Sequence, residues 1–314
     1  MRKPQGARRN FWSVASFSMA FVRRPEQLWQ IRTRTLALGR RTLIMGVLNV
    51  TPDSFSDGGL FFGTSVAVEQ ALAMLDEGAD LIDIGGESTR PSSQALRPEE
   101  EQDRVLPVIE GILRERPAAV LSIDTYKAST AEAALEAGAE IVNDVSAFAW
   151  DDAMAEVCAR AGCGVVLMHT RGHPNEWKTQ RRLRPEEVVP LVAAELTEAM
   201  ERATGAGIDR SRMVLDPGYG FGKALDENYP LLAHLDALMA LGAPLLAGVS
   251  RKSFLGHTMA MATGVADVPV RARADATLAA TTAAILAGAS IVRVHDVRPA
   301  VEAAAIADAI LAAV

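Results

Sequence analysis

The sequence has few cysteines, few aromatic residues and no long apolar run, and each shortage excludes a class of protein. Cys158 and Cys163 are the only cysteines, too few for a disulfide scaffold, so we expect two reduced thiols and a cytoplasmic location. No apolar run approaches the roughly 20 residues that a membrane-spanning helix requires. Aromatic residues make up 5% of the chain, yet 49% of it is hydrophobic. A core built from many small aliphatic side chains favours helices packed closely on a sheet.

The chain also lacks an excess of positive charge, since its formal net charge is −7. A general affinity for nucleic acid or for a membrane surface is therefore not expected. An anionic ligand would have to bind at a local cluster of basic residues.

The N-terminal segment shows no core pattern. Arg8 to Arg24 encloses a short apolar run after paired arginines, loosely as an export signal does, but no clear small-residue cleavage site follows. We predict that residues 1–25 form a disordered extension and residues 26–314 a single domain. A hairpin around Gly39 and Arg40 is expected to lead into the first core strand.

From Leu43 onward, short apolar runs alternate with segments of helical periodicity, and several of these segments close on phrases such as "EGAD" or "AGAE". Eight strands in this alternation predict an α/β fold, a single (β/α)₈ TIM barrel. The runner-up is a doubly wound open sheet, which would require a glycine-rich fingerprint after its first strand. The predicted strands cover residues 43–49, 80–86, 119–124, 140–144, 164–169, 212–218, 244–250 and 290–296.

Every predicted strand ends in polar residues, including Lys, Arg and His, which do not cap helix N-termini. Because active sites of such barrels lie at the carboxyl ends of the strands, these residues predict a functional pocket there. They are Asn49, Asp83 with Glu87, Asp124, Asn143 with Asp144, His169, Asp216, Ser250 with Lys252, and Arg293 with His295.

Seven motifs occur in an order that resembles a known family. They are "GVLNVTPDSFSDGG", "DIGGESTRP", "SIDTYK", "NDVSA", "DPGYGFGK", "GVSRKSFLG" and "VRVHDV". They closely resemble those of the dihydropteroate synthases, and the likeness runs from about Thr42 to the C-terminus. It implies condensation of a hydroxymethyl-dihydropterin diphosphate with 4-aminobenzoate, giving dihydropteroate and diphosphate in folate biosynthesis. It also implies a homodimer.

The pterin ring presents a guanidine-like edge that a buried carboxylate can pair with through two parallel hydrogen bonds. Asp216 is suited to this pairing, while Asp124 and Asn143 can meet other ring nitrogens. The resemblance implies that these three positions bind the pterin, and Met168 is expected to pack on its face.

The diphosphate requires positive charge. Arg293 and His295 are two residues apart on the last strand and so face the same side. The resemblance implies that they hold the diphosphate and that Asn49 helps to bind Mg²⁺ with it. "GYGFGK" is not a phosphate-binding P-loop, because Pro217 and Ala224 occupy positions where Gly and Ser or Thr are required.

The second substrate is expected beside the pterin. The resemblance implies that Lys252 contacts the pterin and lines the aminobenzoate pocket together with Ser250, and we expect Phe221 to form a further wall. The resemblance also implies that loop residues of the first two βα connections close over the bound pterin and help to build this pocket: Phe55, Thr89, Arg90 and Pro91. The catalytic candidates are Asp124, Lys252, Arg293 and His295.

Two sequence features lie outside this scheme. His169 and His173 have the spacing of a helical metal site, but the intervening residues are typical of a loop, so a structural or ligand-contacting role is favoured over zinc. No function follows from the basic segment 171–185.

Two alternative functions remain. One is a pterin-binding methyltransferase domain that donates to a corrinoid protein, and the other is an inactive pterin-binding interaction protein. Lys252, Arg293 and His295 argue against the first, because that domain would lack the diphosphate cluster and this lysine. The second is disfavoured because no motif residue is lost.

Overall fold

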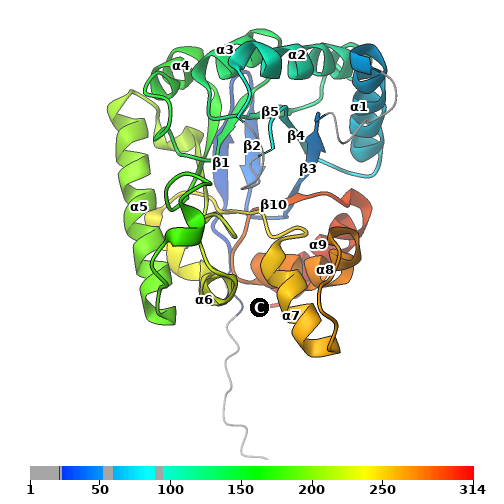
Figure 1. The fold of residues 1–314 in the computed structure, drawn as a ribbon. Helices are drawn as coiled ribbons and strands as arrows, with labels where there is room; N and C mark the ends of the chain where they lie inside the picture. The colour runs from blue at the N-terminus through cyan, green and yellow to red at the C-terminus, as the bar shows by residue number, and fades with distance from the viewer. Residues whose placement is uncertain (1–20, 22, 52–58, 89–94) are drawn as a thin grey trace, which may run out of the picture.

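The computed structural model describes residues 21, 23–51, 59–88 and 95–314, and of residues 59–62 the helical backbone alone. Eight parallel strands form one sheet in the order β8-β7-β6-β5-β4-β3-β10-β9, and helices surround it (Figure 1). These strands are β3 (Leu43–Asn49), β4 (Leu81–Gly85), β5 (Leu121–Asp124), β6 (Ile141–Asp144), β7 (Gly164–Met168), β8 (Met213–Asp216), β9 (Leu246–Ala247) and β10 (Ile291–Val294).

The two ends of the sheet meet. The amide of Leu215 on β8 donates to the carbonyl of Pro244, 2.9 Å away, and Leu215 pairs in parallel with Leu245, which directly precedes β9. The predicted (β/α)₈ barrel is therefore confirmed, and each predicted strand lies within a few residues of an observed one.

Helices follow the strands in the expected alternation. The repeated phrases at their ends supply glycines such as Gly138, whose φ of +115° favours a residue without a side chain. The α-helices are α1 (Gly59–Asp76), α2 (Pro98–Glu115), α3 (Ala128–Glu136), α4 (Met154–Ala161), α5 (Pro185–Gly205), α6 (Asn228–Ala233), α7 (Ser253–Thr263), α8 (Ala274–Leu286) and α9 (Val297–Ala312). Short 3₁₀ helices are η2 (Trp177–Thr179), η3 (Arg210–Arg212), η4 (Leu225–Glu227), η5 (Leu235–Leu241) and η6 (Val270–Arg273). Among the described residues, no helix is long and apolar enough to cross a membrane.

The core has two parts. The larger packs the outer face of the strands against the helices and includes residues such as Ile84, Val142 and Val292. The smaller fills the lower barrel interior with one inward-facing side chain from each of several strands, for example Leu81 and Ile291, and is closed from below by Trp29.

The N-terminal hairpin exists, but its predicted turn is wrong. Strand β1 (Gln27–Gln30) pairs with β2 (Thr35–Leu38), so the turn lies at residues 31–34. A Cβ at Gly39 would lie 2.2 Å from the carbonyl oxygen of Pro25, so this glycine lets the chain pass close to its own start before entering β3. The sequence prediction had missed the four-residue strand β1, which precedes β2 and is its pairing partner.

The predicted extension is shorter at its inner end than expected. Arg24 is buried, donates to the carbonyl of Ala289 at 2.8 Å, and forms an ion pair with Asp308 at 2.5 Å. Phe21 also packs against the core. Residues 23–25 therefore belong to the folded domain, while residues 1–20 lie outside the described part of the chain.

Trp29 seals the barrel floor, and its loss should weaken the whole fold. Its ring is fully buried, its Nε1 donates to the carbonyl of Arg212 at 2.8 Å, and a Cβ at Gly164 would lie only 3.2 Å from the ring. We expect Trp29→Ala to lower the free energy of unfolding by about 3–5 kcal/mol.

The neighbouring Leu28 provides the matched control, since it is 66% exposed. Leu28→Ala should change stability by no more than about 0.5 kcal/mol. Denaturant unfolding of both variants measures the difference, and equal losses would contradict a sealing role for Trp29.

Candidate active site

The inward-facing positions of the barrel strands change from apolar to polar toward the carboxyl ends. On β10, Ile291 belongs to the lower core, while Arg293 and His295 lie above it on the same side. The other strands repeat this change, which gathers polar side chains at one mouth of the barrel. The residues above the lower core are Asp83, Asp124, Asn143, Asp216 and Ser250, with Met168 as the apolar member.

Arg293 links three strands at the centre of this cluster. Its Nε donates to Oδ2 of Asp83 and its Nη2 to Oδ2 of Asp124, both at 2.6 Å. Asn143 donates to the same oxygen of Asp83 at 2.9 Å. Asp83 is fully buried, and its Oδ1 finds no partner within the described part of the chain.

Asp83 was recognised as a polar strand end but not as a site residue. The signal was available, because Asp83 lies two residues after the inward-facing Leu81 and so faces the same interior. It contacts two predicted site residues, Asn143 and Arg293, and fixes their orientation.

Burial and neighbouring charge shift the titration of this group. Burial raises the pKa of Asp124 to about 7, although Arg293 opposes the rise. Burial would lower the pKa of Arg293, but the carboxylates of Asp83 and Asp124 raise it, so the guanidinium stays charged. The cluster thus holds a permanent cation between two carboxyl groups.

Asp216 presents a carboxylate with one side open. Its Oδ1 accepts the amide of Gly218 at 2.7 Å, and burial raises its pKa. A Cβ at Gly248 would meet Oδ2 at 3.6 Å, so glycine at this position leaves space beside that oxygen. A ligand edge that donates hydrogen bonds would compensate the buried charge.

His295 is held by Ser250. The Ser250 hydroxyl lies 2.9 Å from Nδ1 of His295 and accepts the backbone amide of the same residue at 3.3 Å. Burial, reinforced by Arg293, lowers the pKa of His295 to about 3. The low pKa favours the neutral imidazole, whose ring proton lies on Nε2 when the Ser250 hydroxyl donates to Nδ1 and on Nδ1 when that hydroxyl accepts. Ser250 consequently orients His295.

Lys252 lies against an aromatic ring. Its Nζ is 4.0 Å from the centroid of Phe221, a distance typical of a cation–π contact. Burial lowers the pKa of Lys252 to about 8, although Asp216 and Asp124 favour the charged form. The structure therefore brings together the predicted Asp216, Phe221 and Lys252.

Lys223 is a further residue that sequence reasoning missed. It is buried behind Asp216, and its Nζ donates to the carbonyl of Gly218 at 2.8 Å and lies 2.8 Å from Nδ1 of His169. Burial lowers the pKa of Lys223 to about 7 and that of His169 to about 4. The sequence shows Lys223 as the last residue of "DPGYGFGK", but it does not show that its partner is His169, which lies 54 residues away.

His169 and His173 do not converge on one point. Nε2 of His169 lies 3.0 Å from Glu195 without an aligned hydrogen bond, whereas His173 stacks on Trp150 at 4.5 Å. The two histidines thus have separate protein partners, as the loop-like residues between them indicated.

The remaining candidates lie at the edge of this cluster or beyond the described residues. Asn49 is exposed at the end of β3, which pairs with β10, and Met168 is buried at the end of β7. Within the described ranges, no group of three or more His, Cys, Asp or Glu side chains could hold a metal ion. Phe55, Thr89, Arg90 and Pro91 lie outside the described part of the chain.

A cavity of about 720 Å³ lies elsewhere, between segment 171–184 and helix α5. None of the inward-facing strand-end residues lines it. Its arginines are largely paired with its glutamates, for example Arg181 with Glu187 at 3.2 Å. This cavity is therefore distinct from the barrel mouth and gives no indication of a ligand.

Fold and site together define a (β/α)₈-barrel enzyme with a cluster of buried polar and charged side chains at the carboxyl ends of its strands. The sequence profile described as pterin binding enzyme matches residues 45–295. A Bacillus subtilis dihydropteroate synthase is 41% identical over 288 residues, covering 91% of this chain and 95% of that protein.

Solved structures agree with this comparison. A Xanthomonas albilineans dihydropteroate synthase with 4-aminobenzoic acid has a TM-score of 0.82 and 40% identity, covering 92% of this chain and 99% of that one. Another structure of the enzyme from that organism, in complex with 7,8-dihydropteroate, has a TM-score of 0.78 and 38% identity, covering 91% and 99%. The chain belongs to the pterin binding enzyme family, and its function within that family is dihydropteroate synthesis.

Proposed function

We propose that the barrel mouth binds a dihydropterin diphosphate and 4-aminobenzoate side by side and joins them with loss of diphosphate. The observation that carries the proposal is the grouping of Asp216, Lys252 and Arg293 at one end of the barrel. This grouping offers a carboxylate for the pterin edge and two cations for anionic groups.

Asp216 is the proposed pterin anchor. Its raised pKa and open side favour a ligand that donates two hydrogen bonds to the carboxylate. Asp124 and Asn143 face the same interior from neighbouring strands and would meet the other ring nitrogens. Met168 would pack on the ring face.

Arg293 and His295 are the proposed diphosphate ligands. Arg293 supplies the charge, and His295, held at Nδ1 by Ser250, would offer its Nε2 to the diphosphate. Lys252 would contact the pterin and, with Phe221, border the aminobenzoate pocket. Phe55, Thr89, Arg90 and Pro91 remain proposed substrate contacts from the sequence.

Mg²⁺ fits this site as an ion that arrives with the diphosphate. The donor available is the exposed side chain of Asn49, on the strand beside Arg293 and His295. Mg²⁺ commonly binds through few protein ligands together with phosphate oxygens and water. When bound, it would withdraw charge from the diphosphate and make it a better leaving group.

The proposed step is a dissociative substitution with the pterin substrate bound first. The bond from the pterin CH₂ carbon to the diphosphate oxygen breaks, and the amine nitrogen of aminobenzoate forms the new C–N bond. The amine is neutral near pH 7, so its attack needs no strong base, and its extra proton leaves to solvent. Arg293 and His295 stabilise the charge that develops on the leaving group.

The reaction is tested by mixing the protein with pterin diphosphate, 4-aminobenzoate and Mg²⁺ and measuring released diphosphate and dihydropteroate. Both products should form in equal amounts, and chelation of Mg²⁺ should suppress the rate. Diphosphate release without dihydropteroate, or pterin binding with neither product, would contradict the proposal.

Asp216→Asn should weaken pterin binding while preserving shape. A hydrogen bond to a charged group is worth about 1.5–3 kcal/mol, so affinity should fall by roughly one to two powers of ten. Calorimetry with the pterin substrate measures this, with circular dichroism to establish folding. Unchanged affinity in a folded variant would exclude Asp216 as the anchor.

We also propose a homodimer in the cytoplasm, without a nucleic-acid or membrane partner. The large apolar side chains exposed near α7 support the dimer, since Met261 is 74% and Val265 50% exposed. Both cysteines are free and buried, in keeping with a reducing compartment. Sedimentation equilibrium should give twice the 33.5 kDa chain mass, and a monomer at micromolar concentration would contradict the dimer.

A further inference from the structure

Residues 171–184, the part of the basic segment 171–185 that precedes α5, pack against the loop that carries Phe221. Gly222 has a φ of +66°, and a Cβ there would lie 2.6 Å from Cβ of Arg171. A Cβ at Gly218 would lie 1.9 Å from the carbonyl oxygen of His169. The connections after β7 and β8 therefore touch through their backbones, which requires glycine at both positions.

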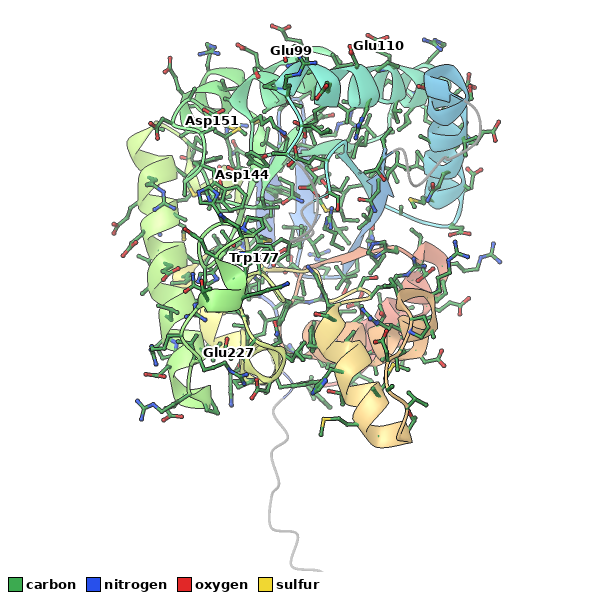
Figure 2. The ribbon with its side chains drawn as sticks, in the orientation of Figure 1. Glu99, Glu110, Asp144, Asp151, Trp177 and Glu227 are labelled. Atoms are coloured by element: carbon green, nitrogen blue, oxygen red, sulfur yellow. The ribbon has the colours of Figure 1, made fainter. Side chains whose placement is uncertain are left out.

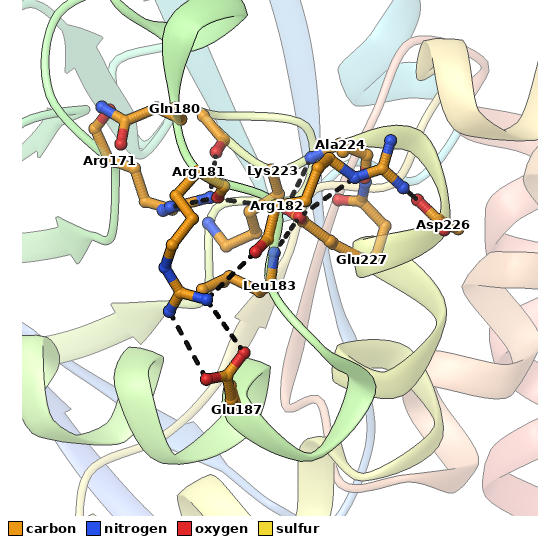
Figure 3. A network of polar contacts seen from close by, with 12 residues as sticks. Arg171, Gln180, Arg181, Arg182, Leu183, Glu187, Lys223, Ala224, Asp226 and Glu227 are labelled. Carbon is orange, nitrogen blue, oxygen red and sulfur yellow. Dashed lines mark hydrogen bonds and ion pairs between the residues drawn. The ribbon is translucent and has the colours of Figure 1, made fainter.

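A buried carboxylate fastens the two connections together. Glu227 is 3% exposed and accepts the amides of Leu183 and Ala224, each at 2.7 Å. Arg171 donates to the carbonyl of Gly222 at 3.0 Å and to that of Arg181 at 2.8 Å (Figure 3). Both ends of segment 171–183 are thus held on the β8 connection.

Trp177 is the part of this segment that reaches the aromatic wall. Its Nε1 donates to the carbonyl of Gly172 at 3.0 Å, and its ring meets Phe221 edge-on, with centroids 5.2 Å apart and planes at 83°. Trp177 is half-buried, and in Figure 2 it lies inside the outline of the surrounding helices.

The contact continues to the charged centre of the site. The ring of Phe221 carries Nζ of Lys252 at 4.0 Å. Trp177, Phe221 and Lys252 therefore form one stack that runs from segment 171–184 into the barrel mouth. If Trp177 were removed, the Phe221 ring would lose its lateral support, and the ammonium of Lys252 would lose a fixed surface.

We propose that Trp177 is a positioning residue for the second substrate, because it holds Phe221 at the angle that forms the aminobenzoate wall. This inference rests on the proposed role of Phe221. Trp177 touches neither the pterin anchor Asp216 nor the diphosphate ligand Arg293 in any described contact, and it reaches Lys252 only through Phe221. Its larger effect should therefore fall on aminobenzoate.

The test is steady-state kinetics with varied 4-aminobenzoate at saturating pterin diphosphate and Mg²⁺. Trp177→Ala should raise KM for aminobenzoate about 3- to 10-fold, the loss expected for one edge-to-face aromatic contact, with kcat nearly unchanged. Pterin affinity from calorimetry should change far less than KM for aminobenzoate, because Asp216 and Arg293 keep their contacts. Trp177→Phe, which keeps an aromatic edge, should recover most of the affinity.

The neighbouring Lys178→Ala is the matched control, since Lys178 is exposed on the same 3₁₀ turn. Its kinetics should equal those of the wild type. An equal drop in pterin affinity and aminobenzoate affinity in Trp177→Ala, with a lowered melting temperature, would indicate general loosening and overturn the inference.

A double-mutant cycle separates the inference from the function on which it rests. Phe221→Ala should also raise KM, and adding Trp177→Ala to it should have little further effect, because the residue that Trp177 positions is gone. Two outcomes would overturn the role of Trp177: additive effects of the two substitutions on KM, or a raised KM in Phe221→Ala with an unchanged KM in Trp177→Ala. An unchanged KM in Phe221→Ala would instead show that Phe221 is not the aminobenzoate wall.

Discussion

Side chains along a strand alternate between two faces, and in a closed barrel the inner face must serve both as core and as site. Most strands meet this constraint by placing an apolar residue low and a polar residue two or four positions higher, whereas β7 keeps the apolar Met168 at its upper end. Ile291 below Arg293 and His295 is one instance, and Leu81 below Asp83 is another. The floor needs its own seal, which Trp29 provides from outside the barrel. The mouth can then carry the polar and charged residues, because apolar side chains already fill the layer beneath it.

The charges at the mouth stabilise one another only in part. Arg293 is satisfied by Asp83 and Asp124, so the free protein pairs its central cation within the barrel. Asp216 and Lys252 have fewer charged partners. Burial raises the pKa of Asp216 and lowers the pKa of Lys252, and both shifts favour the neutral form. A buried charge without a full set of partners costs free energy. The site is therefore better suited to a ligand that brings donors to Asp216 and negative charge to Lys252 and Arg293.

The barrel and most of its inner cluster could be predicted because both depend on local periodicity. Polar residues at strand ends and the spacing of Arg293 and His295 are visible in the sequence alone. The partners of these residues could not be predicted from the sequence, because they are far apart along the chain. Asp83 and Arg293 are 210 residues apart, and His169 and Lys223 are 54 residues apart. The hairpin turn was misplaced for a related reason. Gly39 signals a turn, but it does not reveal that β2 pairs backward with the short β1.

Two glycines of "DPGYGFGK" are required by the packing of this loop against the neighbouring connection. Pro217 and Ala224 depart from the phosphate-binding pattern, and the structure shows a different use for two of these glycines. Gly218 and Gly222 instead allow the β7 connection to lie directly on the β8 connection. Glu227 then fixes that contact from a buried position. Binding residues on strands inherit the rigidity of the barrel, whereas Phe221 stands on a loop and has no such support. The hydrogen bonds that Glu227 accepts from Leu183 and Ala224 hold this loop in place. Segment 171–184, which carries no recognised motif, can therefore influence the position of Phe221.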